Sequence, residues 1–100
     1  MQKVSVMATL KAKAGQERKV KQELVKLLEA TRKEKGCLNY DLHVDAEDPC
    51  TFIFYENWVS RMALANHMET EHFLHLRSLQ AELFAEPTKI SVLRMISDPE

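Results

Sequence analysis

The hydrophobic and polar positions near the start of the chain follow two different periods. Residues 3–12 alternate strictly, and every second side chain is apolar: Val4, Val6, Ala8, Leu10 and Ala12. A period of two predicts a β-strand with one apolar face. Over residues 16–35 an apolar stripe recurs instead at helical spacing, through Val20, Leu24, Leu27, Leu28 and Thr31. This stripe predicts an amphipathic helix that follows Gly15 and has Gly36 as a left-handed stop.

Two further strands are predicted in the middle of the chain. Residues 37–44 alternate again, and their predicted core side carries Leu38, Tyr40, Leu42 and Val44. Residues 51–58 are rich in aromatic and β-branched side chains, which favour strands. The polar segment Asp45–Pro49 lies between the two strands and predicts a hairpin turn.

Two short helices and a last strand are predicted to follow. Ser60 is a suitable N-cap for a helix over residues 60–69, and Thr70 is suitable for another that ends at Glu86–Pro87. The last strand carries Ile90, Val92 and Ile96. The predicted order is therefore β-α-β-β-α-β, with the second helical segment broken in two.

This order predicts an α+β protein of the ferredoxin-like class, in which helices cover one face of a four-stranded antiparallel sheet. The other face would be uncovered although it is rich in apolar side chains: Met7, Cys37, Ile53, Tyr55, Leu93 and Met95. Such a face is too apolar for open water, so we expect two copies to pack their sheets together as a symmetric homodimer. A monomer with a half-wetted sheet is the alternative.

Composition and charge narrow the class of protein. The chain has 100 residues, 45% of them apolar and 29% charged, which fits one globular domain over residues 1–100. The net charge of −1 gives no electrostatic reason to expect nucleic acid as a partner. No apolar run is long enough to span a bilayer, and the first residues lack the apolar stretch of a signal peptide. We therefore expect no membrane partner and a cytoplasmic location.

One acidic residue lies on the predicted core side of a strand. The side chains of Phe52, Phe54, Glu56 and Trp58 alternate toward the helices. An unpaired carboxylate there would cost on the order of several kcal/mol. Glu56 must therefore have a partner, have a raised pKa or line a hydrated cavity. A buried carboxylate of this kind marks a candidate functional site, and a structural ion pair with a basic helix residue is the alternative.

His67 and His72 lie five residues apart, across the break between the two short helices. This is not the i, i+4 zinc spacing, and no cysteine or aspartate cluster completes a site, so we expect no metal. We interpret His67 as a proton-transfer candidate, with a hydrogen-bonded structural histidine as the alternative. The indole of Trp58 is a candidate ligand contact, and Phe73 could wall a flat ligand or pack in the core. The sequence has no glycine-rich phosphate loop, so nucleotide and flavin cofactors are not expected.

Three segments together resemble the antibiotic biosynthesis monooxygenase (ABM) family: Gly36–Tyr40 (GCLNY), Phe54–Trp58 (FYENW) and His67–Phe73 (HMETEHF). The resemblance covers residues 3–96 in the same order and spacing. It implies a dimeric α+β barrel with a pocket between the sheet and the helices of each subunit. It also implies that some relatives oxidise phenols or quinols with molecular oxygen and no metal or flavin, while others isomerise a small phosphorylated compound or degrade haem.

The resemblance places Glu56, Trp58, His67 and His72 at motif positions, with Asn39 and Tyr40 on the preceding strand. We expect His67 to be the catalytic base, tuned by Glu56, in a cofactor-independent monooxygenase of a small phenolic or quinol-type substrate. The expected substrate contacts are Trp58, Asn39, Tyr40, His72 and Phe73.

Two other functions remain open at this point. An isomerase would use the same base without oxygen, and Arg61, Arg77 and Arg94 are available to hold a phosphorylated substrate. A binding module would hold a ligand in the same cavity without turnover.

Overall fold

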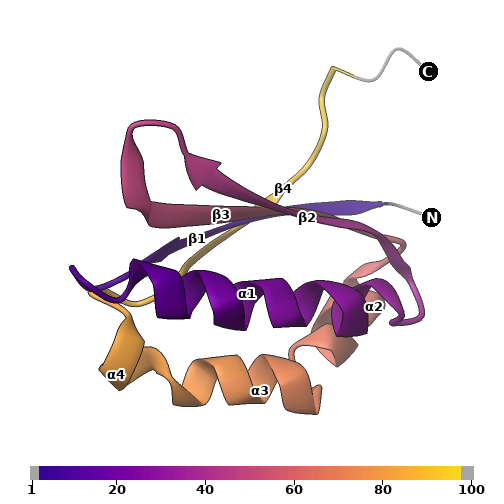
Figure 1. Cartoon of the computed structure of the whole chain (residues 1–100). Helices are drawn as coiled ribbons and strands as arrows, with labels where there is room; N and C mark the ends of the chain where they lie inside the picture. Colours follow the sequence, from indigo (N-terminus) through magenta and orange to yellow (C-terminus); the bar gives the residue numbers. More distant parts are fainter. Residues whose placement is uncertain (1–2, 98–100) are drawn as a thin grey trace.

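The computed structural model describes residues 3–97 and arranges them in two layers (Figure 1). β1 (Val4–Lys11), α1 (Glu17–Arg32), β2 (Cys37–Asp45) and β3 (Asp48–Trp58) form the first half. The second half contains α2 (Arg61–His67), α3 (Glu71–Ser78), α4 (Gln80–Leu83) and β4 (Lys89–Leu93). The predicted order is confirmed, except that the second helical segment is divided into three helices. None of these helices is long and apolar enough to cross a membrane.

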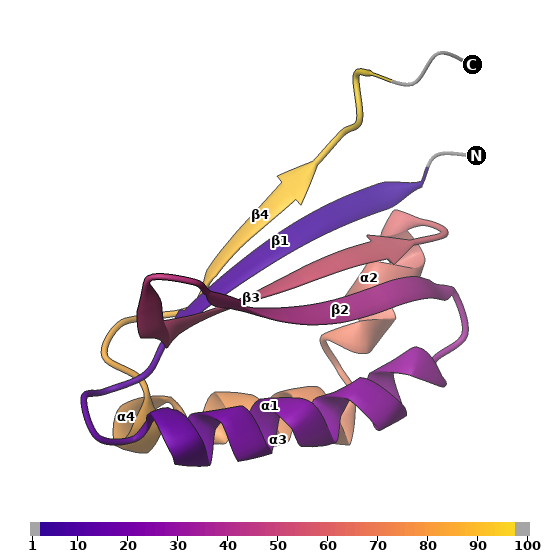
Figure 2. The same cartoon turned by 45° about the horizontal axis from the view of Figure 1, so that its top comes forward.

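The strands form one antiparallel sheet in the order β2-β3-β1-β4, and the helices lie on one face of it (Figure 2). In the two central strands Val6 lies opposite Glu56 and Ala8 lies opposite Phe54. Val6, Ala8, Glu56 and Phe54 are all buried, and they belong to the side of the sheet that the helices cover. The predicted α+β ferredoxin-like class is therefore confirmed.

The core contains the alternating side of β1 and one stripe of α1, as the sequence pattern predicts. Val4, Val6, Ala8 and Leu10 are buried, and so are four α1 side chains: Val20, Leu24, Leu27 and Thr31. The sheet and α1 thus bury their apolar faces against each other, which is the main favourable term in a fold of this size.

A β-bulge at Leu38 reverses two predicted orientations. Cys37 lies opposite Trp58 and Asn39 lies opposite Asn57, so Leu38 has no counterpart on β3. The Leu38 side chain is consequently 55% exposed, whereas Cys37 packs against the core. The prediction that Leu38 faces the core and Cys37 the opposite side was wrong, because one inserted residue flips the alternation before it.

The predicted boundaries of four elements also needed correction. β2 ends at Asp45 and β3 begins at Asp48. The turn between them is therefore two residues long rather than the predicted Asp45–Pro49. α1 ends at Arg32, earlier than predicted. β4 ends at Leu93, and Ile96, which was predicted to be in this strand, lies beyond it and is 86% exposed.

Two N-caps and one glycine position the segments that carry the histidines. The Ser60 hydroxyl accepts from the Ala63 N–H at 3.1 Å, and the Thr70 hydroxyl accepts from the Phe73 N–H at 3.2 Å. The cap predictions are therefore confirmed. Gly36 has φ +93°, as a left-handed stop requires, and a Cβ atom there would lie 2.6 Å from the Cβ of Ala63. Only glycine allows β2 to start this close to α2.

The sheet face away from the helices exposes large apolar side chains in this single chain. Met7, Tyr55, Leu93 and Met95 are each between 37% and 48% exposed. With Cys37 removed from the predicted set, the remaining residues still form an apolar face of the kind that monomeric proteins seldom expose.

Candidate functional site

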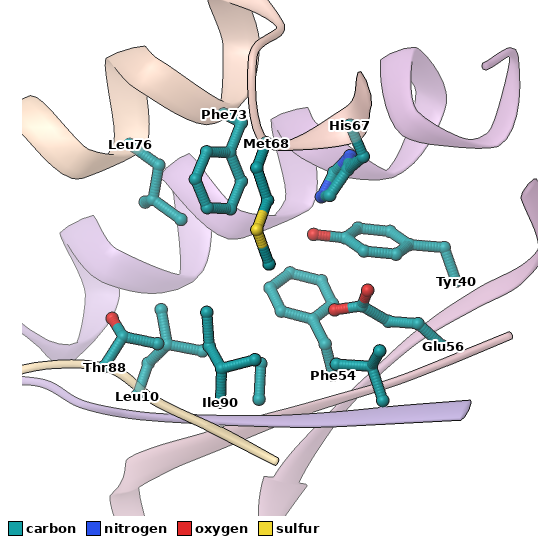
Figure 3. Close-up of a pocket in the computed structure, with 12 residues that line it drawn as sticks. Leu10, Tyr40, Phe54, Glu56, His67, Met68, Phe73, Leu76, Thr88 and Ile90 are labelled. Carbon is teal, nitrogen blue, oxygen red and sulfur yellow. The ribbon is translucent and has the colours of Figure 1, made fainter. Parts of the chain in front are cut away.

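A small cavity lies between the sheet and the helical layer. It measures about 30 Å³, which is room for about two water molecules. Figure 3 shows that Tyr40, Glu56 and His67 gather at one end of it, while Thr88 and the apolar side chains of Leu10, Leu76 and Ile90 surround the other end. We call this space the inner cavity.

A larger cavity of about 460 Å³ adjoins the inner cavity. The two share the lining residues Met68, Phe73, Leu76, Thr88 and Ile90, so they meet where α3 faces β4. We call the larger space the outer cavity. Its volume is within the usual range for small-molecule sites. A ligand can therefore occupy the outer cavity and direct one edge toward the inner cavity.

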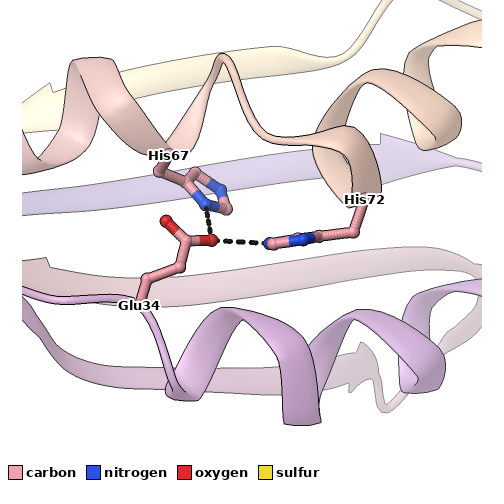
Figure 4. A group of neighbouring side chains, drawn as sticks. All are labelled: Glu34, His67 and His72. Atoms are coloured by element: carbon pink, nitrogen blue, oxygen red, sulfur yellow. Dashed lines mark hydrogen bonds and ion pairs between the residues drawn. The ribbon is translucent and has the colours of Figure 1, made fainter.

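Glu34 joins the two histidines (Figure 4). Its Oε2 atom lies 2.8 Å from Nδ1 of His67 and 2.6 Å from Nε2 of His72. An ionised carboxylate can only accept hydrogen bonds, so each of these imidazole nitrogens carries a proton. Glu34 thereby fixes the tautomer of His67, with the proton on Nδ1 and a lone pair on Nε2.

The Nε2 atom of His67 opens onto the inner cavity. Within residues 3–97 it has no hydrogen-bonding partner. It is also not among the fully enclosed, unpaired side-chain nitrogen and oxygen atoms of that range, where Thr31 Oγ1 is found. Nε2 therefore retains contact with the cavity that His67 lines, although the residue is only 2% exposed. Burial lowers the pKa of His67, against the opposing effect of the Glu34 charge. A neutral imidazole with an available lone pair is suited to act as a base.

Glu56 lies at the same end of the cavity. Its Oε1 accepts a hydrogen bond from the indole N–H of Trp58 at 2.9 Å. Burial raises the pKa of Glu56 to about 7, although the bond from Trp58 opposes this shift. The sequence left three possibilities open for Glu56, and all three apply: it has a neutral partner in Trp58, its pKa is raised, and it lines a cavity. Among the described residues Glu56 forms no ion pair, which was the structural alternative. Near neutral pH Glu56 can therefore either donate or accept a proton.

Tyr40 completes the polar end of the cavity. Its ring stacks on Phe54, with 4.5 Å between centroids, and lies edge-on to His67 at 5.5 Å. Burial raises the pKa of Tyr40, so its phenol stays protonated at neutral pH and remains a hydrogen-bond donor.

The predicted site residues fall into three groups. Tyr40, Glu56, His67 and Phe73 line the inner cavity. Trp58 is fully buried behind them, where it binds Glu56 and packs against the His67 ring with 4.7 Å between centroids. Trp58 contacts Glu56 and His72 contacts Glu34, and neither residue lines the inner or the outer cavity, so their contacts with a substrate stay predictions.

Asn39 does not reach the cavity. It lies opposite Asn57 on the face of the sheet away from the helices, where its side-chain oxygen accepts from Asn57 Nδ2 at 2.9 Å. Its amide nitrogen donates to Asp41 at 3.0 Å. Its position on this face gives no support to the predicted contact of Asn39 with a substrate.

The sequence reasoning missed Glu34, although a signal was present. The buried stripe of α1 continues at helical spacing from Leu27 through Thr31 to position 34, where a carboxylate stands. An acidic residue on an apolar stripe needs a partner, just as Glu56 does. A metal site would need a third ligand beside His67 and His72, and no neighbouring cysteine or aspartate provides one. Glu34, which follows α1, places a carboxylate beside both histidines.

Comparison of the sequence with models of known protein families identifies a family for this chain. A family model described as antibiotic biosynthesis monooxygenase matches residues 3–79. The chain belongs to the antibiotic biosynthesis monooxygenase family. The resemblance that the sequence motifs indicated is therefore confirmed.

The names of individual relatives of this ABM chain describe their function only in general terms. A Mycobacterium tuberculosis protein named provisionally as a monooxygenase is 33% identical over 72 residues, which cover 72% of this chain and 70% of that protein. An uncharacterised Synechocystis protein is 31% identical over 68 residues, or 68% of this chain. The match covers 46% of the Synechocystis protein, so this chain spans about half the length of that relative.

Solved structures show the same ABM fold. A crystal structure of a Pseudomonas aeruginosa protein superposes with a TM-score of 0.91 at 34% identity and covers 97% of both chains. Family membership and the names of the relatives support a monooxygenase-type enzyme in general terms.

Proposed function

We propose that this protein is a cofactor-independent monooxygenase that oxidises a small phenol or quinol with molecular oxygen. The observation that carries the proposal is that His67 lines a cavity while Glu34 contacts its Nδ1 atom, a contact that favours a lone pair on Nε2. This arrangement favours removal of a phenolic proton, the step that converts a phenol into an electron-rich anion able to react with oxygen.

Each group at the polar end has a part in the reaction. The substrate ring occupies the outer cavity and directs its hydroxyl toward Nε2 of His67, which takes the proton. Glu34 stabilises the resulting imidazolium through the 2.8 Å contact at Nδ1. The phenol of Tyr40 and the protonated form of Glu56 donate hydrogen bonds to the developing phenolate.

Oxygen then reacts with the bound anion. Transfer of one electron gives superoxide and a substrate radical, which combine into a peroxide on the ring carbon. Loss of water from this peroxide leaves a quinone, so a phenol and one molecule of oxygen become one quinone and one molecule of water. Apolar side chains that line both cavities, Met68, Phe73, Leu76 and Ile90, limit the access of bulk water to these intermediates.

The narrow inner cavity favours one rival function. A volume of about 30 Å³ does not admit a whole ring, so the hydroxyl of a ring in the outer cavity reaches Nε2 of His67 only if Met68 or Phe73, which line both cavities, moves aside. If they do not move, the protein binds a ligand in the outer cavity without converting it. For the isomerase alternative, Arg77 is the one arginine among the residues that line the inner and outer cavities, so no cluster of cations beside His67 supports it.

We propose that two copies associate through the exposed sheet face. Packing of Met7, Tyr55 and Leu93 against the same residues of a second copy would remove them from water. Light scattering on the eluted peak of a sizing column measures the mass of the particle. A mass of one chain at micromolar concentration would contradict the dimer.

The function is tested by measuring oxygen uptake and product formation with a panel of hydroquinones and naphthols, in air and under nitrogen. We expect turnover that consumes oxygen and stops without it. His67→Gln should lower kcat by about 10²–10⁴-fold. The control His75→Gln, at a 63% exposed histidine on α3, should not change it. Binding without product would support the ligand-binding alternative, and turnover that continues under nitrogen would contradict the monooxygenase.

A further inference from the structure

We propose that Glu34, His67 and His72 form a binding site for a divalent transition-metal ion such as Zn²⁺. The three residues come from separate elements: Glu34 follows α1, His67 ends α2 and His72 lies in the first turn of α3. One ligand atom from each lies within 4.8 Å of the others. Figure 4 shows the carboxylate of Glu34 facing both imidazole rings. Two imidazole nitrogens and one carboxylate oxygen are the donor set of many zinc and non-haem iron sites.

The present distances require all three contacts to adjust before an ion fits: the two contacts to Glu34 open, while the two imidazole nitrogens, which lie within 4.8 Å of each other, approach to about 3.4 Å. Metal–ligand bonds of about 2.0–2.2 Å place neighbouring ligand atoms roughly 2.9–3.4 Å apart, depending on whether the geometry is octahedral or tetrahedral. The contacts from Glu34 Oε2 to the two histidines are 2.8 and 2.6 Å. Each contact therefore has to open by less than about 1 Å, and the ion replaces the two protons that these nitrogens now share with Glu34.

Packing holds one side of the site and solvent reaches the other. The His67 ring lies against Trp58 and Phe73, with centroid distances of 4.7 and 5.1 Å. The side chains of Glu34 and His72 are 13% and 25% exposed. An ion from solution can therefore reach the site past His72, and water molecules can complete the coordination of that ion, while packing keeps the His67 ring in place.

An ion at this site would change what His67 presents to the inner cavity. A metal on Nδ1 leaves the remaining proton of the neutral ring on Nε2, which then becomes a donor rather than a base. If the proposed oxidation of phenols is correct, the ion inhibits it. This consequence rests on the proposed function, whereas the metal site itself does not.

The test measures binding directly, without a substrate. The full-length chain, made without a histidine tag and treated with a chelator, is titrated with Zn²⁺ by calorimetry and with Co²⁺ by visible absorption. We expect one ion per chain. His72→Ala should weaken binding by at least about tenfold, and the fold of this variant is checked by circular dichroism. His75→Ala, on the same helix, should bind like the original protein.

X-ray absorption at the zinc edge identifies the ligands. We expect nitrogen and oxygen neighbours that include two imidazoles. Sulfur neighbours would overturn the proposal, because they would place the ion on Cys37 or Cys50. Equal affinity in the original protein and in folded His72→Ala, or no stoichiometric binding, would also overturn it. None of these results depends on whether the protein oxidises phenols, so the two proposals fail separately.

Discussion

Replacing Glu56 by glutamine should make the protein less sensitive to rising pH. The folded protein raises the pKa of this carboxyl from 4.5 to about 7, mainly by burial. The folded state therefore holds the proton more tightly than the unfolded chain. Stability is lost as the pH rises above 4.5, and the loss levels off above pH 7.

The size of this effect follows from the shift. At 1.36 kcal/mol per pKa unit, Glu56 removes about 2.5 kcal/mol of unfolding free energy between pH 5 and pH 8. Glutamine keeps the shape of the side chain and an oxygen that can accept from the Trp58 indole, but it does not titrate. The loss should therefore be absent from Glu56→Gln.

Urea unfolding at one protein concentration, at several values between pH 5 and pH 8, measures the difference. His67, whose pKa is lowered, contributes stability that increases with pH in the lower part of this range, but it does so in both proteins. The difference between the two unfolding curves thus isolates Glu56. Parallel pH profiles for the two proteins would refute the assignment of a raised pKa to Glu56.

Two other pairs of substitutions test separate parts of the structure. Glu34→Gln removes a charged hydrogen bond to each histidine and should lower kcat for phenol oxidation about 10- to 100-fold, whereas the control Glu29→Gln, on the exposed side of α1, should leave kcat unchanged in the same oxygen-uptake assay. Gly36→Ala should lower the free energy of unfolding by at least about 2 kcal/mol more than Gly15→Ala does, as measured by unfolding in urea. Both glycines have positive φ, but only at Gly36 would the new Cβ meet Ala63, at 2.6 Å. Equal losses would show that the contact with α2 yields easily.

The sequence predicted the fold well because the fold depends on local patterns. Alternation in β1, the stripe of α1 and the capping residues Ser60 and Thr70 each follow from a few neighbouring residues. The bulge at Leu38 was not predictable in this way, because an inserted residue leaves no trace in the alternation and is visible only in the pairing with β3.

The candidate site was predicted in part for the same reason. Glu56 could be singled out because it stands on a predicted core-facing side of a strand, and His67 because an imidazole near a helix end is a proton-transfer candidate; the structure brings both to one cavity. The partner of His67 is a matter of tertiary structure: Glu34 is 33 residues away in sequence. Pairing His67 with Glu56, the buried carboxylate already recognised, overlooked this more distant one.

The central claim is that Glu34 holds the proton of His67 on Nδ1 and leaves a lone pair on Nε2 facing the cavity. Nitrogen-15 NMR of the imidazole, on metal-free protein at a pH where His67 is neutral, reports which ring nitrogen carries the proton. We predict protonated Nδ1 and unprotonated Nε2, with the Nε2 signal shifting when a phenol is added. A proton on Nε2 in the neutral ring would contradict the account, because His67 could then not act as the base.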